Sequence, residues 1–368
     1  MRALGLFWAA VVLVLLAGGA TLQVLGPPAP EVAADAGSAL VQPPASPPVP
    51  AQPAATQAPP PAATTPPATS LPPVHGPGGA PPVTARIVPG PRAPGAPVPP
   101  PDPALQEASG LGDGSFLPRV AGGLAPMRAY AAGAPPPDAR PRVAILLADF
   151  AMREADSEEA IRILPAAVSF AVSPYALRPG AAVQRAQVER ARQAGHETLI
   201  ALPMEPRGYP LNDPGDRALL TGAPAERNAE MLRWTLSRLG GKVGVTGALG
   251  SLRGERFAAS EQMTGVLEEI GRRGLIYVDP RPEGRLAAPL TAGPRRAVDL
   301  VVDKPGVRTE IEAKLERLEQ LARDRGAALG LVSAPTPVAV ERLAAWTSLL
   351  AQRGVVLVPV SALVVPVE

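Results

Sequence analysis

The residues best suited to chemistry lie in the stretch 198–214, which reads TLIALPMEPRGYPLNDP. It begins with a short apolar run, 198–202, that predicts a strand. Pro203 and Pro206 then end regular structure and hold the next residues extended. Polar side chains follow just past the end of this strand, among them Glu205, Tyr209, Asn212 and Asp213. In alternating α/β folds, ligand-handling residues collect at that end of the strands, although such a loop could equally be a packed turn whose acids cap backbone amides.

Further acidic residues lie at the ends of other predicted strands. Asp149 follows a buried run that begins at Val143, and Asp279 follows the run 275–278, with Arg281 two residues later. Parallel strands present their carboxyl ends at one edge, so the sequence predicts an acidic mouth made of Asp149, Glu205, Asp213 and Asp279. Two carboxylates across a pocket can perform general acid–base chemistry without a metal. The alternative is that Asp149 and Asp279 only end their strands by bonding loop amides.

An alternation of strands and helices must position these residues. Between 143 and 358, short apolar runs alternate with amphipathic segments that stop at glycines. The segment 309–325 is an example, because its apolar residues share one helical face and Gly326 follows. Such alternation is typical of parallel strands joined by right-handed crossovers. Roughly seven or eight units of this kind predict an α/β fold and a (β/α) barrel.

Composition bounds the functions that the chain of 368 residues can have. Lys+Arg 35 against Asp+Glu 33 leaves a net charge of +2, which is too balanced to suggest a nucleic-acid partner. Cysteine is absent, which excludes disulfides, thiol nucleophiles and cysteine-based metal sites. Of two histidines, His75 lies in a proline-rich stretch and has no expected role, whereas His196 precedes a predicted strand.

The first residues predict export. Arg2 is followed by an almost unbroken apolar run, 4–25, which is long enough to cross ~30 Å of hydrocarbon as a helix. With Arg2 kept in the cytoplasm, residues 1–26 would form a single-pass anchor in the inner membrane and the C-terminal domain would lie in the periplasm. The small residues 17–20 leave a cleaved signal peptide as the alternative.

Three more regions follow along the chain. Residues 27–109 are rich in proline and alanine and predict a disordered linker, because they offer too little apolar surface to offset the entropy of ordering. Residues 110–141 regain aromatic and aliphatic residues and predict an arm that packs on the domain. Residues 142–368 form the α/β domain, which we expect to fold without the first ~105 residues.

Several short motifs carry a resemblance to a known family. The chain from about 142 to 365 resembles the divergent polysaccharide deacetylase family, a distant branch of the NodB-like carbohydrate deacetylases. The resemblance implies a distorted (β/α)7-type barrel. Its motifs occur here in order as Ser173-Pro174-Tyr175, Gly195-His196-Glu197, Leu202-Pro203-Met204-Glu205-Pro206, Tyr209-Pro210, Asn212-Asp213-Pro214, Val243-Gly244-Val245-Thr246, Gly250-Ser251 and Arg273-Gly274-Leu275.

The chemistry implied by this resemblance is incomplete in the chain. Active members would use a divalent metal, usually zinc, to polarise an acetamide and activate water. Their Asp-Asp pair stands at Ala148 and Asp149, and their two histidine positions are Ala201 and Ala248. A zinc site needs about three protein ligands, and only Asp149 remains. We therefore predict no metal ligand and no cofactor, with zinc bound only if the site has been rearranged.

Two main functions compete. The first is a metal-free pseudoenzyme that binds an envelope glycan such as peptidoglycan, or an envelope protein, with Tyr209, Asn212, Asp213, Asp279 and Arg281 as substrate-binding residues. The alternative is an active polysaccharide deacetylase that hydrolyses the C–N bonds of N-acetyl amino sugars, with Asp149 or Glu205 as catalytic base. A third possibility is a structural spacer without a pocket. His196 is expected to be a structural, hydrogen-bonded residue at the opposite end of the barrel.

Overall fold

The computed structural model describes residues 90, 92–282 and 293–364. The predicted anchor at 4–25 and most of the predicted linker lie outside these residues. Among the residues that are described, no helix is both long and apolar enough to cross a membrane.

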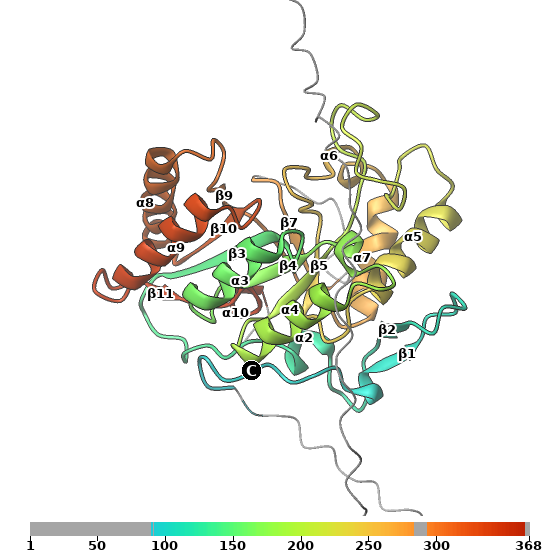
Figure 1. The fold of residues 1–368 in the computed structure, drawn as a ribbon, viewed down its shortest axis with the longest axis horizontal. Coiled ribbons are helices and arrows are strands. Elements are labelled where there is room, and N and C mark those ends of the chain that lie inside the picture. Colours follow the sequence, from blue (N-terminus) through green and yellow to red (C-terminus); the bar gives the residue numbers. More distant parts are fainter. Residues whose placement is uncertain (1–89, 91, 283–292, 365–368) are drawn as a thin grey trace, which may run out of the picture. The chain divides into compact units, whose positions relative to one another are not determined.

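A parallel sheet forms the centre of the domain (Figure 1). Its strands are hydrogen-bonded in the order β8-β7-β6-β5-β4-β3-β10-β9, and β11 pairs with β3 outside this order. The nine strands are β3 (Arg142–Phe150), β4 (Ser169–Val172), β5 (Thr198–Ala201), β6 (Gly244–Thr246), β7 (Ile276–Asp279), β8 (Arg295–Ala297), β9 (Leu300–Val301), β10 (Ala327–Val332) and β11 (Val356–Leu357).

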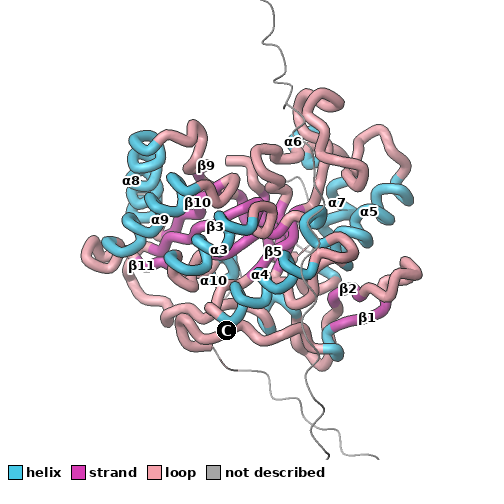
Figure 2. The backbone as a smooth tube through the Cα atoms, viewed as in Figure 1, coloured by secondary structure: helices cyan, strands magenta, loops and turns pink. Residues whose placement is uncertain are grey.

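The two ends of this strand order are neighbours in the sequence. At one end β8 pairs with β7, and at the other end β9 pairs with β10. Only Val298 and Asp299 separate β8 from β9. The chain therefore draws the two ends together, and the sheet is strongly curled into a half-barrel (Figure 2). This confirms the predicted α/β fold with parallel strands.

Helices cover the convex side of the curled sheet (Figure 1). Glycine ends the longest of them: α8 stops at Gly326, whose φ of 81° is left-handed and favours a residue without a side chain. Thr336 begins α9 by accepting a hydrogen bond from the amide of Ala339. The helices of this layer are α3 (Glu154–Ile163), α4 (Ala182–Gln193), α5 (Ala225–Ser237), α6 (Glu255–Ala258), α7 (Gln262–Arg272), α8 (Arg308–Arg325) and α9 (Pro337–Leu349).

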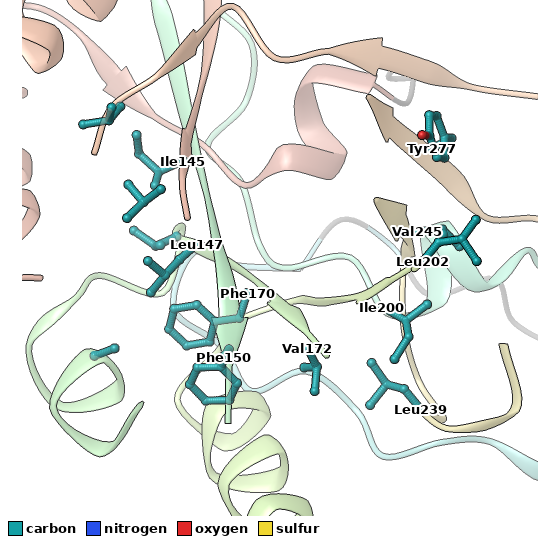
Figure 3. Packing of buried hydrophobic residues seen from close by; sticks show 14 of the residues in the cluster. Ile145, Leu147, Phe150, Phe170, Val172, Ile200, Leu202, Leu239, Val245 and Tyr277 are labelled. Carbon is teal, nitrogen blue, oxygen red and sulfur yellow. The ribbon is translucent and has the colours of Figure 1, made fainter. Parts of the chain in front are cut away.

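Side chains alternate between two apolar layers, one on each face of the sheet. The layer between strands and helices includes Ile145, Leu147, Phe170, Ile200, Val245 and Tyr277 (Figure 3). The opposite layer contains the residues between these positions, among them Ala144, Leu146, Leu199, Ile276 and Val278. Because both faces of β3 are buried, its sequence reads as one continuous apolar run.

The opposite layer, on the face of the sheet away from the covering helices, is called the inner layer here. It is completed by the arm and by the last helix. The arm contains a 3-10 helix, η1 (Pro103–Leu105), an antiparallel hairpin of β1 (Gln106–Ala108) and β2 (Phe116–Pro118), and α2 (Pro126–Ala129). The last helix is α10 (Val360–Val364). Val98 and Leu105, which lie in the predicted linker, are 4% and 1% exposed and belong to this layer. The packed arm thus begins before residue 110, which argues against a domain that is independent of its first ~105 residues.

Glu197 joins the arm, the sheet and the last helix. It immediately precedes β5 and is fully buried. Its Oε2 accepts hydrogen bonds from the amide of Ala132 at 3.0 Å and the hydroxyl of Ser361 at 2.5 Å. Its Oε1 accepts from the hydroxyl of Ser169 at 2.8 Å and the amide of Ser361 at 2.9 Å. One carboxylate therefore satisfies four donors from three separate segments.

His196 stands beside Glu197 and has a structural environment. Its Nδ1 lies 2.8 Å from the carbonyl oxygen of Val168, which can only accept, so Nδ1 carries the proton. The ring stacks on Phe170 with centroids 4.2 Å apart, and Nε2 is buried without a partner among the described residues. Burial lowers the pKa of His196 to about 4. The predicted structural role at the amino-terminal end of the strands agrees with this geometry.

We predict that the free energy of unfolding decreases as the pH falls from about 6.5 to about 4. In this window the unfolded chain binds a proton at His196 and the folded chain does not, so the stabilisation is complete above the window and lost towards its lower end. The loss is on the order of 3 kcal/mol. Urea unfolding at several pH values would measure it, and His196→Phe should flatten this part of the profile. If the free energy of unfolding changed with pH in the same way for the wild type and for His196→Phe, the effect could not be assigned to His196.

Candidate functional site

The carboxyl end of β3 carries the clearest backbone strain in the described chain. The register between β3 and β4 shifts between Leu147 and Phe150, which marks a bulge. Asp149 and Ala151 have positive φ values of 52° and 67°, and they are the only non-glycine residues with positive φ among those described. Left-handed backbone costs such residues about 1–2 kcal/mol each, and strain of this kind clusters at functional sites. The bulge therefore marks the mouth as the candidate site.

The Asp149 side chain lies against the loop that follows β6. A methyl group at Gly250 would be 2.6 Å from its Oδ2, so only glycine leaves room for the carboxyl group there. Burial raises the pKa of Asp149, while a hydrogen bond from the Gly250 amide and the charge of Arg253 partly oppose the increase. The backbone thus presents a half-buried carboxyl group whose proton is held more tightly than in water.

Behind Asp149 lies a buried polar network that the sequence did not predict. Arg253, 7% exposed, donates from Nη2 to the hydroxyl of Ser333 at 2.8 Å. That hydroxyl donates to Oδ1 of Asp303 at 2.9 Å, and the Ser333 amide donates to Oδ2 at 2.9 Å. Arg253 Nη1 also donates to the carbonyl oxygens of Gly250 and Leu252. The network fixes the Gly250 loop against the ends of β9 and β10, and thereby the donor to Asp149.

Glu205, predicted as a catalytic residue, is engaged in holding two loops together. Its side chain is 4% exposed. Oε2 accepts from the amide and the hydroxyl of Thr221 at 2.6 and 2.7 Å, and Oε1 pairs with Nε of Arg256 at 3.0 Å. Both oxygens are occupied within the protein, so this carboxylate serves the structure of the mouth.

Asp279 and Arg281, predicted to bind substrate, bind each other. Nε and Nη2 of Arg281 donate to the two carboxylate oxygens of Asp279 at 2.8 and 2.7 Å. Asp279 is 1% exposed and also accepts from the Arg281 amide at 3.1 Å. A bidentate pair of this kind neutralises the carboxylate and closes the end of β7. The alternative reading of Asp279, that it ends its strand by bonding a loop amide, is therefore the one that the geometry supports.

The predicted substrate-binding residues Tyr209, Asn212 and Asp213 lie on the loop between β5 and α5. Asn212 Nδ2 donates to the carbonyl oxygen of Arg207 at 2.8 Å, and Asp213 Oδ1 accepts from the Gly215 amide at 2.8 Å. Both side chains are exposed and make turns within the loop. Tyr209 is half-buried, and its amide bonds the carbonyl oxygen of Pro206. These contacts shape the loop, and none of them joins the loop to Asp149.

Tyr175, at the end of β4, fixes the same loop from the other side. Its hydroxyl donates to the carbonyl oxygen of Pro214 at 3.0 Å and accepts from the Arg217 amide at 3.2 Å. Burial raises the pKa of Tyr175 to about 12, so the phenol keeps its proton. The ring has the Arg178 guanidinium 5.2 Å from its centroid and the Trp234 ring at 5.9 Å.

A shallow hollow of about 370 Å³ lies beside the β3 bulge. It is lined by Ala151 and Met152 from the bulge and by Tyr175, Arg178 and Gln184 from the segment after β4. Met152 is 50% exposed. The hollow thus offers an aromatic ring and an apolar side chain next to a cation and an amide. Of these residues, sequence reasoning noted only Tyr175, as part of a motif; the hollow itself has no sequence signal.

The described residues do not fit a zinc ion. Ala201 and Ala248 stand at the two histidine positions of the implied ligand set, and Ala148 stands at one position of the implied Asp-Asp pair; all three are fully buried alanines without a donor atom. Asp149 is the remaining carboxylate of that set. Across the described ranges, no group of three His, Cys, Asp or Glu side chains could hold a metal ion. The chemistry of this mouth therefore has to be derived from Asp149 and its neighbours.

Comparisons with known proteins place the chain in a family. Residues 145–364 match the divergent polysaccharide deacetylase family. An uncharacterized protein, ATU2773 from Agrobacterium tumefaciens C58, is 32% identical, with a TM-score of 0.60 over 68% of this chain and 99% of that one. A putative cellobiose-phosphate cleavage protein, EF3048 from Enterococcus faecalis V583, is 12% identical, with a TM-score of 0.40 over 61% of this chain and 100% of that one. No curated protein matches. The chain belongs to the divergent polysaccharide deacetylase family.

Proposed function

We propose that the domain binds a glycan at the Asp149 mouth without hydrolysing it, as a metal-free pseudoenzyme of its family with the (β/α)7-type barrel. The proposal rests on one observation, which is the difference between the residues that stand at the family's site positions near the ends of neighbouring strands. The two family histidine positions and one position of the Asp-Asp pair are buried alanines, whereas Asp149 remains half-buried on a strained bulge. Strain is retained where the surroundings enforce a useful geometry, and here the geometry presents one carboxyl group.

The hollow beside the β3 bulge, which begins at Ala151 two residues after Asp149, suits a sugar. A pyranose has apolar C–H faces and a rim of hydroxyl groups, so it needs an apolar surface next to polar groups. The hollow supplies the Tyr175 ring and Met152 for the faces, and Arg178 and Gln184 for the hydroxyls. Asp149 can accept from a hydroxyl when ionised and can donate when protonated. An N-acetyl amino sugar of the envelope, as in peptidoglycan, matches this combination.

The alternative is an active deacetylase, and one observation favours it. Burial raises the pKa of Asp149 towards the range in which a carboxylate acts as a general base near neutral pH. Glu205 is a poorer candidate for the base because both of its oxygens are already bonded. Under this alternative Asp149 would take a proton from the water molecule that attacks the acetamide carbon and would return it to the nitrogen as the C–N bond breaks and acetate leaves.

The proposed setting is the cell envelope. An apolar anchor at 4–25 would hold the protein in the inner membrane, and the domain would meet its ligand in the periplasm. An envelope protein is the other class of partner for the mouth. Direct binding of peptidoglycan fragments by the purified protein would support the glycan, whereas its absence would leave an envelope protein as the partner of the mouth.

We expect Asp149→Asn to weaken binding of peptidoglycan fragments about tenfold, since one charged hydrogen-bond acceptor is lost. Isothermal titration of the full-length protein in chelator-treated buffer would measure the dissociation constant. The variant should fold normally, because burial already disfavours the charge that it removes. Asp324→Asn, at an exposed position on α8, is the matched control.

Three results decide between the readings. Binding that persists in chelator and weakens only in Asp149→Asn supports the pseudoenzyme. Acetate release from acetylated chitin oligomers by the wild type, lost in Asp149→Asn, would establish the deacetylase instead. Stoichiometric zinc found by elemental analysis, together with that activity, would overturn the metal-free reading altogether.

A further inference from the structure

A second hollow lies between α5 and α7, which are neighbours in Figure 1, and it shares no described lining residue with the hollow beside the β3 bulge. Its volume is about 470 Å³. Leu232 and Val266 are its most buried apolar members, and the small residues Ala225 and Ala229 line its α5 side. At one end the groove is closed by a hydrogen bond of 2.7 Å from Asn228 Nδ2 to Gln262 Oε1. Neighbouring helices therefore leave an apolar groove that nothing in the described chain fills.

Gly265 lines the groove, and its lack of a side chain leaves space there. It lies inside α7 with helical backbone, since its φ is not positive, and a methyl group placed there would meet no atom within 4 Å. Glycine in a helix interior costs about 1 kcal/mol relative to alanine. Neither the backbone conformation nor a neighbour within the domain requires glycine here. The absence of a side chain at this exposed position would let another backbone approach α7 closely.

The groove is lined by charged side chains of both signs, and one of them, Arg233, is left without a partner among the described residues. Arg233 borders it and makes no ion pair or hydrogen bond in the described structure. The other two arginines at this end, Arg272 and Arg273, are both paired with Glu269. An occupant that brings a carboxylate to Arg233 would gain a pair that the domain itself does not supply.

We propose that the groove between α5 and α7 docks an amphipathic helix of a partner protein, with its apolar ridge on Leu232 and Val266 and an acidic side chain on Arg233. From Gln262 to Arg273 the groove runs along roughly three helical turns, about 16 Å, which suits a short helix laid between two others. Gly265 lets the backbone of that helix approach α7. This surface is separate from the glycan site, and the proposal does not depend on the proposed function.

The test uses a pair of synthetic helical peptides that share a leucine ridge and differ only in a glutamate or a lysine on its flank. Fluorescence anisotropy of each labelled peptide would be followed against the full-length protein in one detergent. The glutamate peptide should bind more tightly. Arg233→Glu should weaken that peptide about fivefold and strengthen the lysine peptide by a similar factor, as expected for exchange of one surface ion pair.

Gly265→Leu is the blocking variant, because a Cβ at this position meets no atom within 4 Å and the larger side chain would extend into the groove. It should reduce binding of the glutamate peptide more than tenfold while the unfolding transition stays unchanged or moves upwards. Glu268→Leu, also exposed on α7 but outside the groove, is the matched control and should leave binding unchanged.

Other occupants give other results. Equal binding of both peptides, with no response to Gly265→Leu, would overturn the proposal. If neither peptide bound while Gly265→Leu abolished self-association of the chain, the groove would be an interface between copies. If neither peptide bound and the same variant abolished palmitate binding, the groove would hold an acyl chain. Either of these results also overturns a helical partner.

Discussion

Replacing Glu197 with alanine is expected to lower the free energy of unfolding by about 3–5 kcal/mol. The change leaves the amides of Ala132 and Ser361 buried without an acceptor, and two serine hydroxyls lose theirs. Each buried donor without a partner costs about 1–3 kcal/mol. Because the donors come from the arm, β4 and α10, the loss loosens all three together. Urea unfolding monitored by tryptophan fluorescence would measure it.

Glu197→Gln is the informative control. The glutamine amide keeps one oxygen acceptor but presents an NH₂ group to at least one backbone amide, where two donors then meet. Its destabilisation should lie between those of the wild type and the alanine variant. If Glu197→Ala unfolded at the same urea concentration as the wild type, the hydrogen bonds of this carboxylate could not be what holds the three segments together.

Removing all residues before Gly110 is expected to cost about 3–6 kcal/mol, whereas a chain that begins at residue 90 should be as stable as the full chain. The shorter chain lacks Val98 and Leu105, and burial of each such side chain contributes about 1.5–3 kcal/mol. It also lacks the hydrogen bond from the Val98 amide to the carbonyl oxygen of Arg192, at 2.9 Å. Thermal unfolding of the two truncated proteins would show the difference.

Leu105→Ala in the full chain separates lost packing from lost chain length. It should cost about 2–5 kcal/mol, as for other buried leucines. Identical melting of the chains beginning at 90 and 110 would restore the original expectation that the domain is independent of everything before its arm.

Much of the fold can be predicted from the sequence because the sheet is parallel and buried on both faces. The run from Val143 to Leu147 has no polar interruption, and it forms the core of β3. Helix α8 was predicted to within one residue, since its apolar face and the left-handed Gly326 are both local signals. The positions of Ala148 and Ala201 at strand ends also follow from such local runs.

The site was harder to predict because hydrogen-bond partners are distant in the sequence. Arg253 and Ser333 are 80 positions apart, and neither carries a pattern that points to the other. Asp279 and Arg281 are an exception, because they are only two positions apart, yet the sequence does not show that the turn after β7 folds the guanidinium back onto the carboxylate. Likewise, single apolar residues such as Val98 and Leu105 among prolines give no periodic signal, although they complete the inner layer. Pairing and packing across long separations decide which acids remain available.

The hydrogen bonds of Glu197 also affect when the domain can fold during synthesis. Ser361 is 164 positions from Glu197 and Ala132 is 65 positions away, so these hydrogen bonds close two very long loops. The entropic cost of such closure is met only when many other contacts already hold the ends near each other. Because the ribosome delivers Ser361 164 residues after Glu197, Glu197 stays without half of its donors until α10 has been synthesised. The nascent domain is therefore expected to become protease-resistant in one late step, after α10 has emerged.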